Sequence, residues 1–556
     1  MVTGCPISPN EDPNEDPVVA VTGITNGPSA ATAGTPLVLS GTVQPSNATN
    51  KTIVWTVKDA GETGAAISGS TLNTTAAGSA TVTATIVNGI AAGTDYAKDF
   101  IIAVTVDADI LNLSVYSTST EISNFIQTMV TGRENNGTTA EKAITVKVAN
   151  ANFASAAAMT PLLQGINDYY VNLEIMSGSG ATFPNLSSVT SGVTKDKILS
   201  LILPETVTAV AAYIANYNGA FYGFTGLTSV SFPGAVTIGS EAFQNCGSLV
   251  SVNLPKATTI GDNAFQNCGS LVSVNLPKAT TIGGGAFFRC TSLATVGLPV
   301  ATSIGNSAFS NCDNLDSVSL PAAASIGNSA FSSCPSLTSV DLPKATSIGY
   351  YAFTYCTSLA SVSLPVAASI DSYTFRGCTN LATVDLPKVT SINGYAFEGC
   401  TTLVSVDLPV ATIISAGAFY GCTSLASVDL PAAISIGNFA FYGCTSLVSV
   451  DLPVATSIGS EAFSGCDSLV SVSLPVATSI GNYFFYLCTN LSTLTLPATP
   501  PTKDGYIFSG IGTSSAYQAI TIRVPTGSSD NYSTSTWPRG TSQSYGGYVT
   551  VTFVEY

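Results

Sequence analysis

The chain has 556 residues, too many for one compact core, so we expect two to four structural units. Its formal net charge of −16 repels phosphate backbones, which argues against nucleic acid as a partner. Charged residues make up only 9% of the chain and the mean hydropathy is +0.38, but no apolar run approaches the roughly 18 residues of a membrane-spanning helix.

Residues 1–17 are rich in proline and acidic residues, a composition that predicts a flexible tether. Within them, Val2-Thr3-Gly4-Cys5 resembles a bacterial lipobox, which implies that Cys5 is lipidated; a stray N-terminal thiol is the alternative. The sequence lacks the basic and hydrophobic region that precedes a lipobox. We therefore expect that the chain starts, at Met1, just inside a signal peptide whose upstream part has been removed.

Residues 18–106 alternate Thr, Val and Gly with almost no helical periodicity, and strands are predicted at 37–43, 53–57 and 80–86. The segment resembles the group 2 bacterial Ig-like domain. The matching positions are Gly34, Pro45-Ser46-Asn47-Ala48-Thr49, Trp55 and Ala77-Gly78-Ser79-Ala80. The resemblance implies a spacer β-sandwich, in which Trp55 belongs to the core.

Residues 107–226 are less regular, and we interpret them as an N-terminal cap with degenerate repeats. Apolar spacing predicts helices at 121–130 and 156–166. Strands are expected at 143–148, 170–175 and 201–204.

Residues 227–496 repeat every 22 residues, which is typical of a stacked array. Leu recurs from Leu227 to Leu491, Ile from Ile238 to Ile480, Phe from Phe221 to Phe485 and Cys from Cys246 to Cys488. In each repeat, a segment such as 447–453 predicts one short strand that Pro ends. Thirteen stacked repeats would bury the apolar columns between them. A parallel β-helix is the rival architecture.

The pattern L-x-S-V-x-L-P-x-A-T-S-I-G-x-x-A-F-x-x-C-x-S resembles the BspA-like, or treponemal, leucine-rich repeat over about residues 220–496. That family usually has one more residue between Pro and Ile, so the shorter repeat is expected to change the curvature. The resemblance implies a bacterial surface protein that binds host or partner macromolecules.

Twelve of the thirteen cysteines follow the repeat. Disulfides are not predicted, because Cβ vectors of equivalent residues in successive repeats run parallel. The chain has no CxxC pair and no histidine, which argues against zinc, and we expect no cofactor. The cysteines therefore predict a ladder of small buried thiols.

After Leu496 the period stops, and residues 497–556 are interpreted as a C-terminal cap with strands at 519–525 and 548–554. The segment 524–528, together with Tyr532 and Trp537, is similar to the closing segment of the BspA-like family.

Without histidine there is no Ser-His-Asp or Cys-His arrangement, and a regular ladder offers no pocket that excludes water. We therefore predict that the protein is not an enzyme.

Two surface stripes are candidate binding sites. The acidic stripe follows the outward residue of each strand, and it either keeps a solvated face soluble or receives a basic partner or bridging divalent cations. Lys344 and Lys388 are expected to offset two of its charges. The acidic stripe comprises Asp341, Asp385, Asp407, Asp429 and Asp451.

The aromatic stripe follows the repeat Ile by three residues. It either contacts a partner or merely stiffens the array by mutual stacking. Its members are Tyr351, Tyr373, Tyr395, Phe439 and Tyr483.

The predicted fold is mixed, mainly β: a leucine-rich-repeat solenoid with a parallel strand ladder, preceded by an Ig-like β-sandwich. The predicted function is non-catalytic binding of a protein or glycan by a monomer that is either held at a bacterial cell surface or secreted. Its only contact with the membrane is the lipid anchor. A self-associating surface component and a carbohydrate-binding module are the alternatives.

Overall fold

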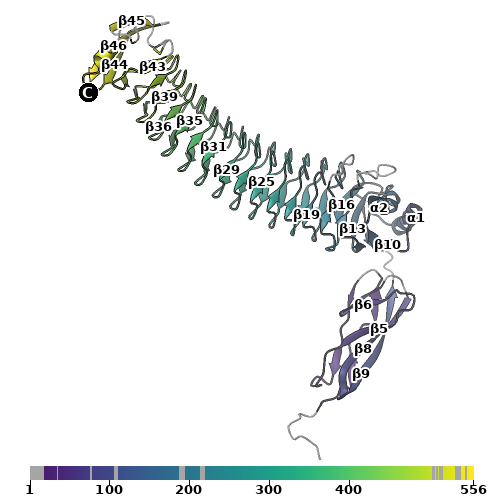
Figure 1. The fold of residues 1–556 in the computed structure, drawn as a ribbon. Coiled ribbons are helices and arrows are strands. Elements are labelled where there is room, and N and C mark those ends of the chain that lie inside the picture. The colour runs from purple at the N-terminus through teal and green to yellow at the C-terminus, as the bar shows by residue number, and fades with distance from the viewer. Residues whose placement is uncertain are drawn as a thin grey trace, which may run out of the picture. The chain divides into compact units, whose positions relative to one another are not determined.

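The computed structural model describes residues 18–556, except 34–35, 75–77, 106–109, 187–194, 213–218, 504–506, 509–510, 512–516, 533–536, 538–539 and 545–546 (Figure 1). Two compact units are present. The first comprises Met1–Arg133, Val146–Ala151 and Ile175–Gly178, and the second Glu134–Thr145, Asn152–Glu174 and Ser179–Tyr556. Cys5 and the predicted tether lie outside the described residues.

The first unit begins with a β domain whose strands surround one core. A four-stranded sheet has the order β2-β9-β8-β5, a three-stranded sheet the order β3-β7-β6, and β1 pairs with β4. Trp55 is 6% exposed within this core and packs on Phe100, so its predicted core position is confirmed. The strands are β1 (Gly23–Thr25), β2 (Ala30–Thr32), β3 (Leu37–Val38), β4 (Thr42–Gln44), β5 (Val54–Asp59), β6 (Ala66–Ser68), β7 (Thr71–Asn73), β8 (Gly78–Ala91) and β9 (Thr94–Thr105).

The strand predicted at 37–43 is wrong in one respect, because the structure divides it into β3 and β4. These two strands pair with different partners, β3 with β7 and β4 with β1. A continuous run of β-forming residues does not reveal that the chain changes sheets within it.

Both predicted helices are present. Helix α1 (Ser119–Val130) starts two residues earlier than predicted, because Thr118 and Glu121 form a capping box in which each side chain accepts a backbone N–H. Helix α2 (Ala156–Gly165) is capped by Ser155. The intervening and following strands are β10 (Ile110–Asn112), β11 (Ile144–Ala149), β12 (Ala151–Asn152), β13 (Val171–Ile175), β14 (Gly178–Ser179), β15 (Thr182–Phe183), β16 (Ile198–Ile202) and β17 (Ala209–Val210).

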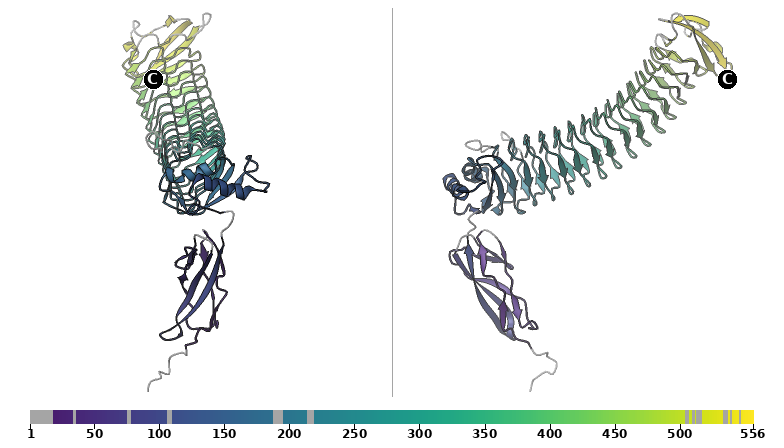
Figure 2. Two further views of the ribbon diagram at one scale, coloured as in Figure 1. Left: turned by 90° about the vertical axis from the view of Figure 1, so that its right-hand side faces the viewer. Right: turned by 180° about the vertical axis from the view of Figure 1, so that it is seen from behind.

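The second unit contains the repeats, stacked as one curved array (Figure 2). We number the repeats as rungs 1 to 13, from the one that begins at Leu227 to the one that begins at Leu491. Equivalent residues of successive rungs are register partners, such as Val230 and Val252, so the predicted parallel ladder is confirmed. Its strands are β18 (Ser229–Ser231), β20 (Ser251–Asn253), β22 (Ser273–Asn275), β24 (Thr295–Gly297), β26 (Ser317–Ser319), β28 (Ser339–Asp341), β30 (Ser361–Ser363), β32 (Thr383–Asp385), β34 (Ser405–Asp407), β36 (Ser427–Asp429), β38 (Ser449–Asp451), β40 (Ser471–Ser473) and β42 (Thr493–Thr495).

Each of rungs 1 to 12 adds a second strand, of two residues, which the sequence did not predict. These strands pair in parallel through the repeat Ile, as Ile238 does with Ile260. They are β19 (Thr237–Ile238), β21 (Thr259–Ile260), β23 (Thr281–Ile282), β25 (Ser303–Ile304), β27 (Ser325–Ile326), β29 (Ser347–Ile348), β31 (Ser369–Ile370), β33 (Ser391–Ile392), β35 (Ile413–Ile414), β37 (Ser435–Ile436), β39 (Ser457–Ile458) and β41 (Ser479–Ile480).

A column of phenylalanines fills the array. From Phe243 to Phe463 each ring stacks on the next, with centroids 5.1 to 5.5 Å apart and near-parallel planes. Every ring in this run is fully buried. Each ring therefore covers the apolar side of the neighbouring rung and keeps it from water.

The cysteine column lies beside the phenylalanines, and the prediction of buried thiols is confirmed. Each Sγ–H donates a hydrogen bond to the Phe carbonyl of the preceding rung, as Cys356 does to Phe331 O at 3.1 Å. Burial raises the pKa of the Cys246 thiol to about 12, and that of Cys356 lies well above its ordinary value. A cysteine fits this position because it is small and apolar and still supplies a weak donor.

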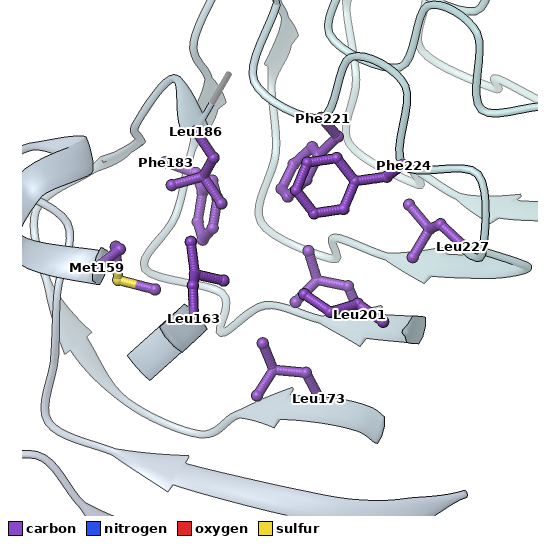
Figure 3. A pocket seen from close by; sticks show the side chains of 10 residues that line it. Met159, Leu163, Leu173, Phe183, Leu186, Leu201, Phe221, Phe224 and Leu227 are labelled. Carbon is purple, nitrogen blue, oxygen red and sulfur yellow. The ribbon is translucent and has the colours of Figure 1, made fainter. Parts of the chain in front are cut away.

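The N-terminal end of the array is covered by apolar side chains. Figure 3 shows Met159 and Leu163 of α2 facing a small cavity of about 10 Å³, which Leu201 of β16 and Phe221 also line. The cavity has no polar lining, so it provides no hydrogen bond to a buried water. These side chains cover the apolar end of the array.

The C-terminal end continues the ladder through β44, which pairs in parallel with β42 and β46. Tyr532 is buried against Trp537, and its hydroxyl donates to Pro497 O at 2.6 Å. The two aromatic residues thus anchor the cap to the last rung. Its elements are β43 (Thr502–Lys503), β44 (Tyr517–Val524), the 3-10 helix η2 (Ser529–Asn531), β45 (Gly540–Ser544) and β46 (Gly547–Glu555).

We expect Phe331→Ala to lower the free energy of unfolding of the surrounding rungs by about 3–5 kcal/mol, because the cavity it leaves lies between two stacked rings. Hydrogen exchange across rungs 4 to 7 measures this loss locally. Ser333→Ala on the surface of the same rung is the control, and an equally small effect of both variants would contradict a sealing role for the ring column.

We expect the array to lose stability steeply as pH rises above about 8.5. The unfolded thiols ionise near that pH, whereas the folded thiols keep their protons until far higher pH. The free energy of unfolding then falls by about 1.4 kcal/mol per pH unit for each thiol, with no effect below about pH 8. Urea titrations between about pH 8 and pH 11 measure the slope. Cys356→Ala should reduce the slope of unfolding free energy against pH by about 1.4 kcal/mol per pH unit. An unchanged slope would contradict the idea that the folded protein keeps the Cys356 thiol protonated.

Candidate functional site

The acidic stripe occupies one exposed face of the three-residue strands. Its five carboxylates stand at the last residue of β28, β32, β34, β36 and β38, and all are exposed. Asp407 and Asp429 are direct register partners, so their Cα atoms are one strand spacing apart, about 4.8 Å. The structure therefore places Asp385, Asp407, Asp429 and Asp451 in the consecutive rungs 8 to 11, with Asp341 farther along the same face.

Two carboxylates of the acidic stripe accept hydrogen bonds from serine hydroxyls. Asp341 accepts a hydrogen bond from Ser319 Oγ at 3.2 Å, and Asp385 accepts one from Ser363 Oγ at 2.7 Å. Neither lysine that follows these residues forms an ion pair within the described ranges. The offset of charge by Lys344 and Lys388 therefore stays a prediction, while the direct contacts of Asp341 and Asp385 are with serines of the preceding rung.

The carboxylates of Asp407, Asp429 and Asp451 have no hydrogen-bond or ion-pair partner in the part of the chain that the structure describes. Exposed valines border this row of carboxylates in rungs 9, 11 and 12, one just after the repeat Leu and one just after the repeat Pro, each side chain being 42–51% exposed. Rung 10, which carries Asp429, has Ala426 and Ala432 at these two positions. We call the two sets of valines the valine rows. They consist of Val404, Val448 and Val470 on one side, and Val410, Val454 and Val476 on the other.

The aromatic stripe lies directly after the two-residue strands, in a backbone conformation that the sequence did not reveal. Tyr351, Tyr373 and Tyr395 have φ values of 59°, 61° and 58°, in the left-handed region that favours glycine or asparagine. Phe439 and Tyr483 share it, with φ values of 60° and 52°. Bulky side chains therefore stand where they strain the backbone.

The stripe is not continuous. Tyr351 stacks on Tyr373 at 4.8 Å and Tyr373 on Tyr395 at 5.3 Å, with planes within 3° of parallel. Gly417 then interrupts the column. Phe439 packs edge-on against Tyr442, and Tyr483 packs edge-on against Tyr486. Three members thus form one stack. Phe439 is linked to it indirectly, because Tyr442 stacks on Tyr420 and Tyr420 contacts the Tyr395 ring, whereas Tyr483 packs against Tyr486.

Sequence reasoning missed three residues beside this stack. Tyr350 and Tyr355 are 50% and 48% exposed. The Arg376 guanidinium lies 5.6 Å from the Tyr373 ring centre and 5.8 Å from that of Tyr355, and its Nε is 3.0 Å from Glu398. Tyr355 occupies a second left-handed position of the rung, with φ 59°. Only the pairing of rungs shows that this position adjoins the stripe.

Three further features bear on function: metal ligands, membrane-spanning helices and a half-buried lysine. Among the described residues, no three Cys, Asp or Glu side chains converge to hold a metal ion. No helix in the described ranges is long and apolar enough to cross a membrane. Burial lowers the pKa of Lys195, whose Nζ donates to Tyr222 O at 3.0 Å and lies over the Phe224 ring, an arrangement that packs the cap.

Comparison with solved structures finds similar leucine-rich-repeat proteins. A leucine-rich repeat protein from Bacteroides ovatus is 25% identical, with 64% of this chain and 92% of that chain covered and a TM-score of 0.43. A leucine rich cell surface protein from Faecalibacterium prausnitzii is 25% identical, covering 59% and 84%, with a TM-score of 0.33. The pneumococcal vaccine antigen PcpA is 16% identical, covering 75% and 93%, with a TM-score of 0.31.

No curated protein matches the chain in a sequence comparison. The family profile described as "BspA type Leucine rich repeat region (6 copies)" matches residues 213–338, 302–413 and 412–524. Together these segments span more than half of the 556 residues, and they coincide with the stacked rungs. The chain therefore belongs to the BspA type leucine-rich-repeat family.

Proposed function

We propose that this protein is a non-catalytic, adhesin-like protein of a bacterial cell surface, and that it binds a host or partner macromolecule along the acidic stripe. The observation that carries the proposal is the row formed by Asp407, Asp429 and Asp451. These carboxylates are exposed, adjacent and without partners in the described ranges, and they stand on a rigid ladder.

The row is electrostatically unfavourable in the free protein. Like charges about 5 Å apart repel by about 1 kcal/mol in water, and the ladder prevents the strands from separating. A basic partner would replace this repulsion with attraction, and it would be steered to the face by the field of the row. The complement is thus a cationic protein surface.

The valine rows add apolar contact area on both sides of the carboxylates. Exposed apolar groups bordering charged ones are common at protein interfaces, where apolar burial stabilises and charges set orientation. Val410 and Val454 replace the lysines found at the same position of rungs 6 and 8. Affinity would therefore arise from many modest contacts over four rungs.

The N-terminal segments fit presentation of this face away from a membrane. The β domain resembles a bacterial Ig-like spacer, and the acidic, proline-rich segment before it has the composition of a tether. We propose that Cys5 carries the lipid that attaches the tether. Charge repulsion from phosphate backbones makes nucleic acid an unsuitable partner.

We expect Asp407→Lys/Asp429→Lys/Asp451→Lys to lower affinity for the partner at least about tenfold, because three favourable contacts become repulsive. The wild type and the variant, fixed on beads, capture proteins from a host-surface extract. Each protein captured selectively by the wild type is then purified and titrated against both. Binding by the wild type should also weaken with added salt.

A variant with Asp313→Lys, Glu461→Lys and Asp467→Lys serves as the matched control. It changes net charge by the same amount but leaves the strand face intact. Equal affinity of the stripe variant and the wild type would remove the acidic stripe as the binding site. Equal losses in both variants would show that only net charge matters.

We expect Cys5 to take up a labelled fatty acid when the chain is produced in bacteria behind a lipoprotein signal sequence. Cys5→Ala should abolish the label, because the other twelve thiols are buried. Labelling that persists in Cys5→Ala would refute the proposed anchor.

A further inference from the structure

The three-ring stack of the aromatic stripe differs between its middle and its N-terminal end. Tyr373 has a ring on both faces, whereas Tyr351 has one only on the side of rung 7. On the side of rung 5 the equivalent residue is Ser329, which has no ring to offer. Tyr351 is correspondingly 39% exposed, while Tyr373 and Tyr395 are only partly exposed.

Tyr355 lies in the neighbouring left-handed column, where its ring lies over Gly377 of rung 7 and not over another ring. Its equivalent in rung 5 is Ser333, and the two rungs are joined there by a hydrogen bond from Ser333 N to Thr354 O at 2.8 Å. The array therefore changes abruptly from serines in rung 5 to large rings in rung 6. We call this boundary the aromatic step, made of Tyr350, Tyr351 and Tyr355 on one side and Ser329 and Ser333 on the other.

The tyrosines of the aromatic step contact polar side chains of both neighbouring rungs. The Arg376 guanidinium lies near the centres of both the Tyr355 and Tyr373 rings, and its pairing with Glu398 neutralises its charge. The Tyr350 N–H donates to Asn328 Oδ1 at 3.0 Å, which joins the two sides of the step. The site thus presents aromatic surface, hydroxyls and an amide, with little net charge of its own.

We propose that the aromatic step binds a hexopyranose unit of a neutral glycan. A pyranose ring has an apolar C–H face that packs on an aromatic ring, and hydroxyls around its edge that match the serine hydroxyls beside the ring. The overall charge of −16 repels anionic sugars, so the ligand is a neutral one.

The location follows from which ring faces are available. Along the middle of the stack the faces cover one another, so only ring edges and hydroxyls reach solvent. At the aromatic step, neighbouring serines leave a face of Tyr351 and of Tyr355 without a stacked ring. This site is separate from the acidic stripe, and its failure would leave the proposed function untouched.

The test uses the full chain and a panel of neutral oligosaccharides built from glucose, galactose, mannose or N-acetylglucosamine. Binding on an array is followed by calorimetric titration of the strongest ligand. The variant Tyr351→Ser/Tyr355→Ser copies Ser329 and Ser333, which already occupy the same left-handed positions at φ 54° and 57°, so the backbone accommodates it. We expect this variant to lose at least about tenfold in affinity.

Tyr395→Gly is the matched control, because it removes a ring of the same stack and copies Gly417 of the next rung. It should change affinity by less than about twofold, while circular dichroism confirms that both variants keep their fold. The proposal is overturned if the wild type binds no member of the panel. Equal losses in both variants, or an unaffected double variant, would overturn it as well.

Discussion

The constant length of the rungs is the constraint on which the rest of the array depends. Two parallel ladders, one through the repeat Val and one through the repeat Ile, pair each rung with residues 22 positions away. An insertion of one residue within a strand would turn the inward residues of that strand to solvent. Longer steps, such as the 23 residues from Ser479 to Thr502, are accommodated at the end of the array, outside the strands. Equal length therefore keeps leucine, phenylalanine and cysteine in separate buried columns.

The same register places identical surface residues next to each other, with consequences that depend on their chemistry. Aromatic rings in adjacent rungs attract, and Tyr351 and Tyr373 are stacked with planes only 1° from parallel. Carboxylates in adjacent rungs repel, and Asp407 and Asp429 cannot move apart without breaking the ladder. A column whose side chains attract one another stabilises the array, whereas a column whose side chains repel one another gains energy by contacting a partner of opposite charge. This contrast favours the acidic row over the middle of the aromatic stack as a protein-binding surface.

Much of the fold was predictable because the spacing of apolar residues along the chain determines which side chains are buried. The three-residue strands, the buried Phe and Cys columns, both helices and the C-terminal strands follow from residue type and spacing. The two-residue strands were missed because Ser457-Ile458 is too short to show alternation. The division between Val38 and Thr42 was missed because strand propensity does not encode which sheet a strand joins.

The candidate sites were less predictable, because their properties arise between rungs. The positive φ of Tyr351 follows from a tight turn, where the equivalent residues include Asn263, Gly285 and Ser307. Reading that column as a set, with Gly and Asn among its members, could have indicated a left-handed position. Reading the Tyr355 column in the same way would have placed Ser333 and Gly377 beside it. A single repeat shows the composition of a surface, but the difference between one repeat and the next shows where a ring face is left without a stacked neighbour.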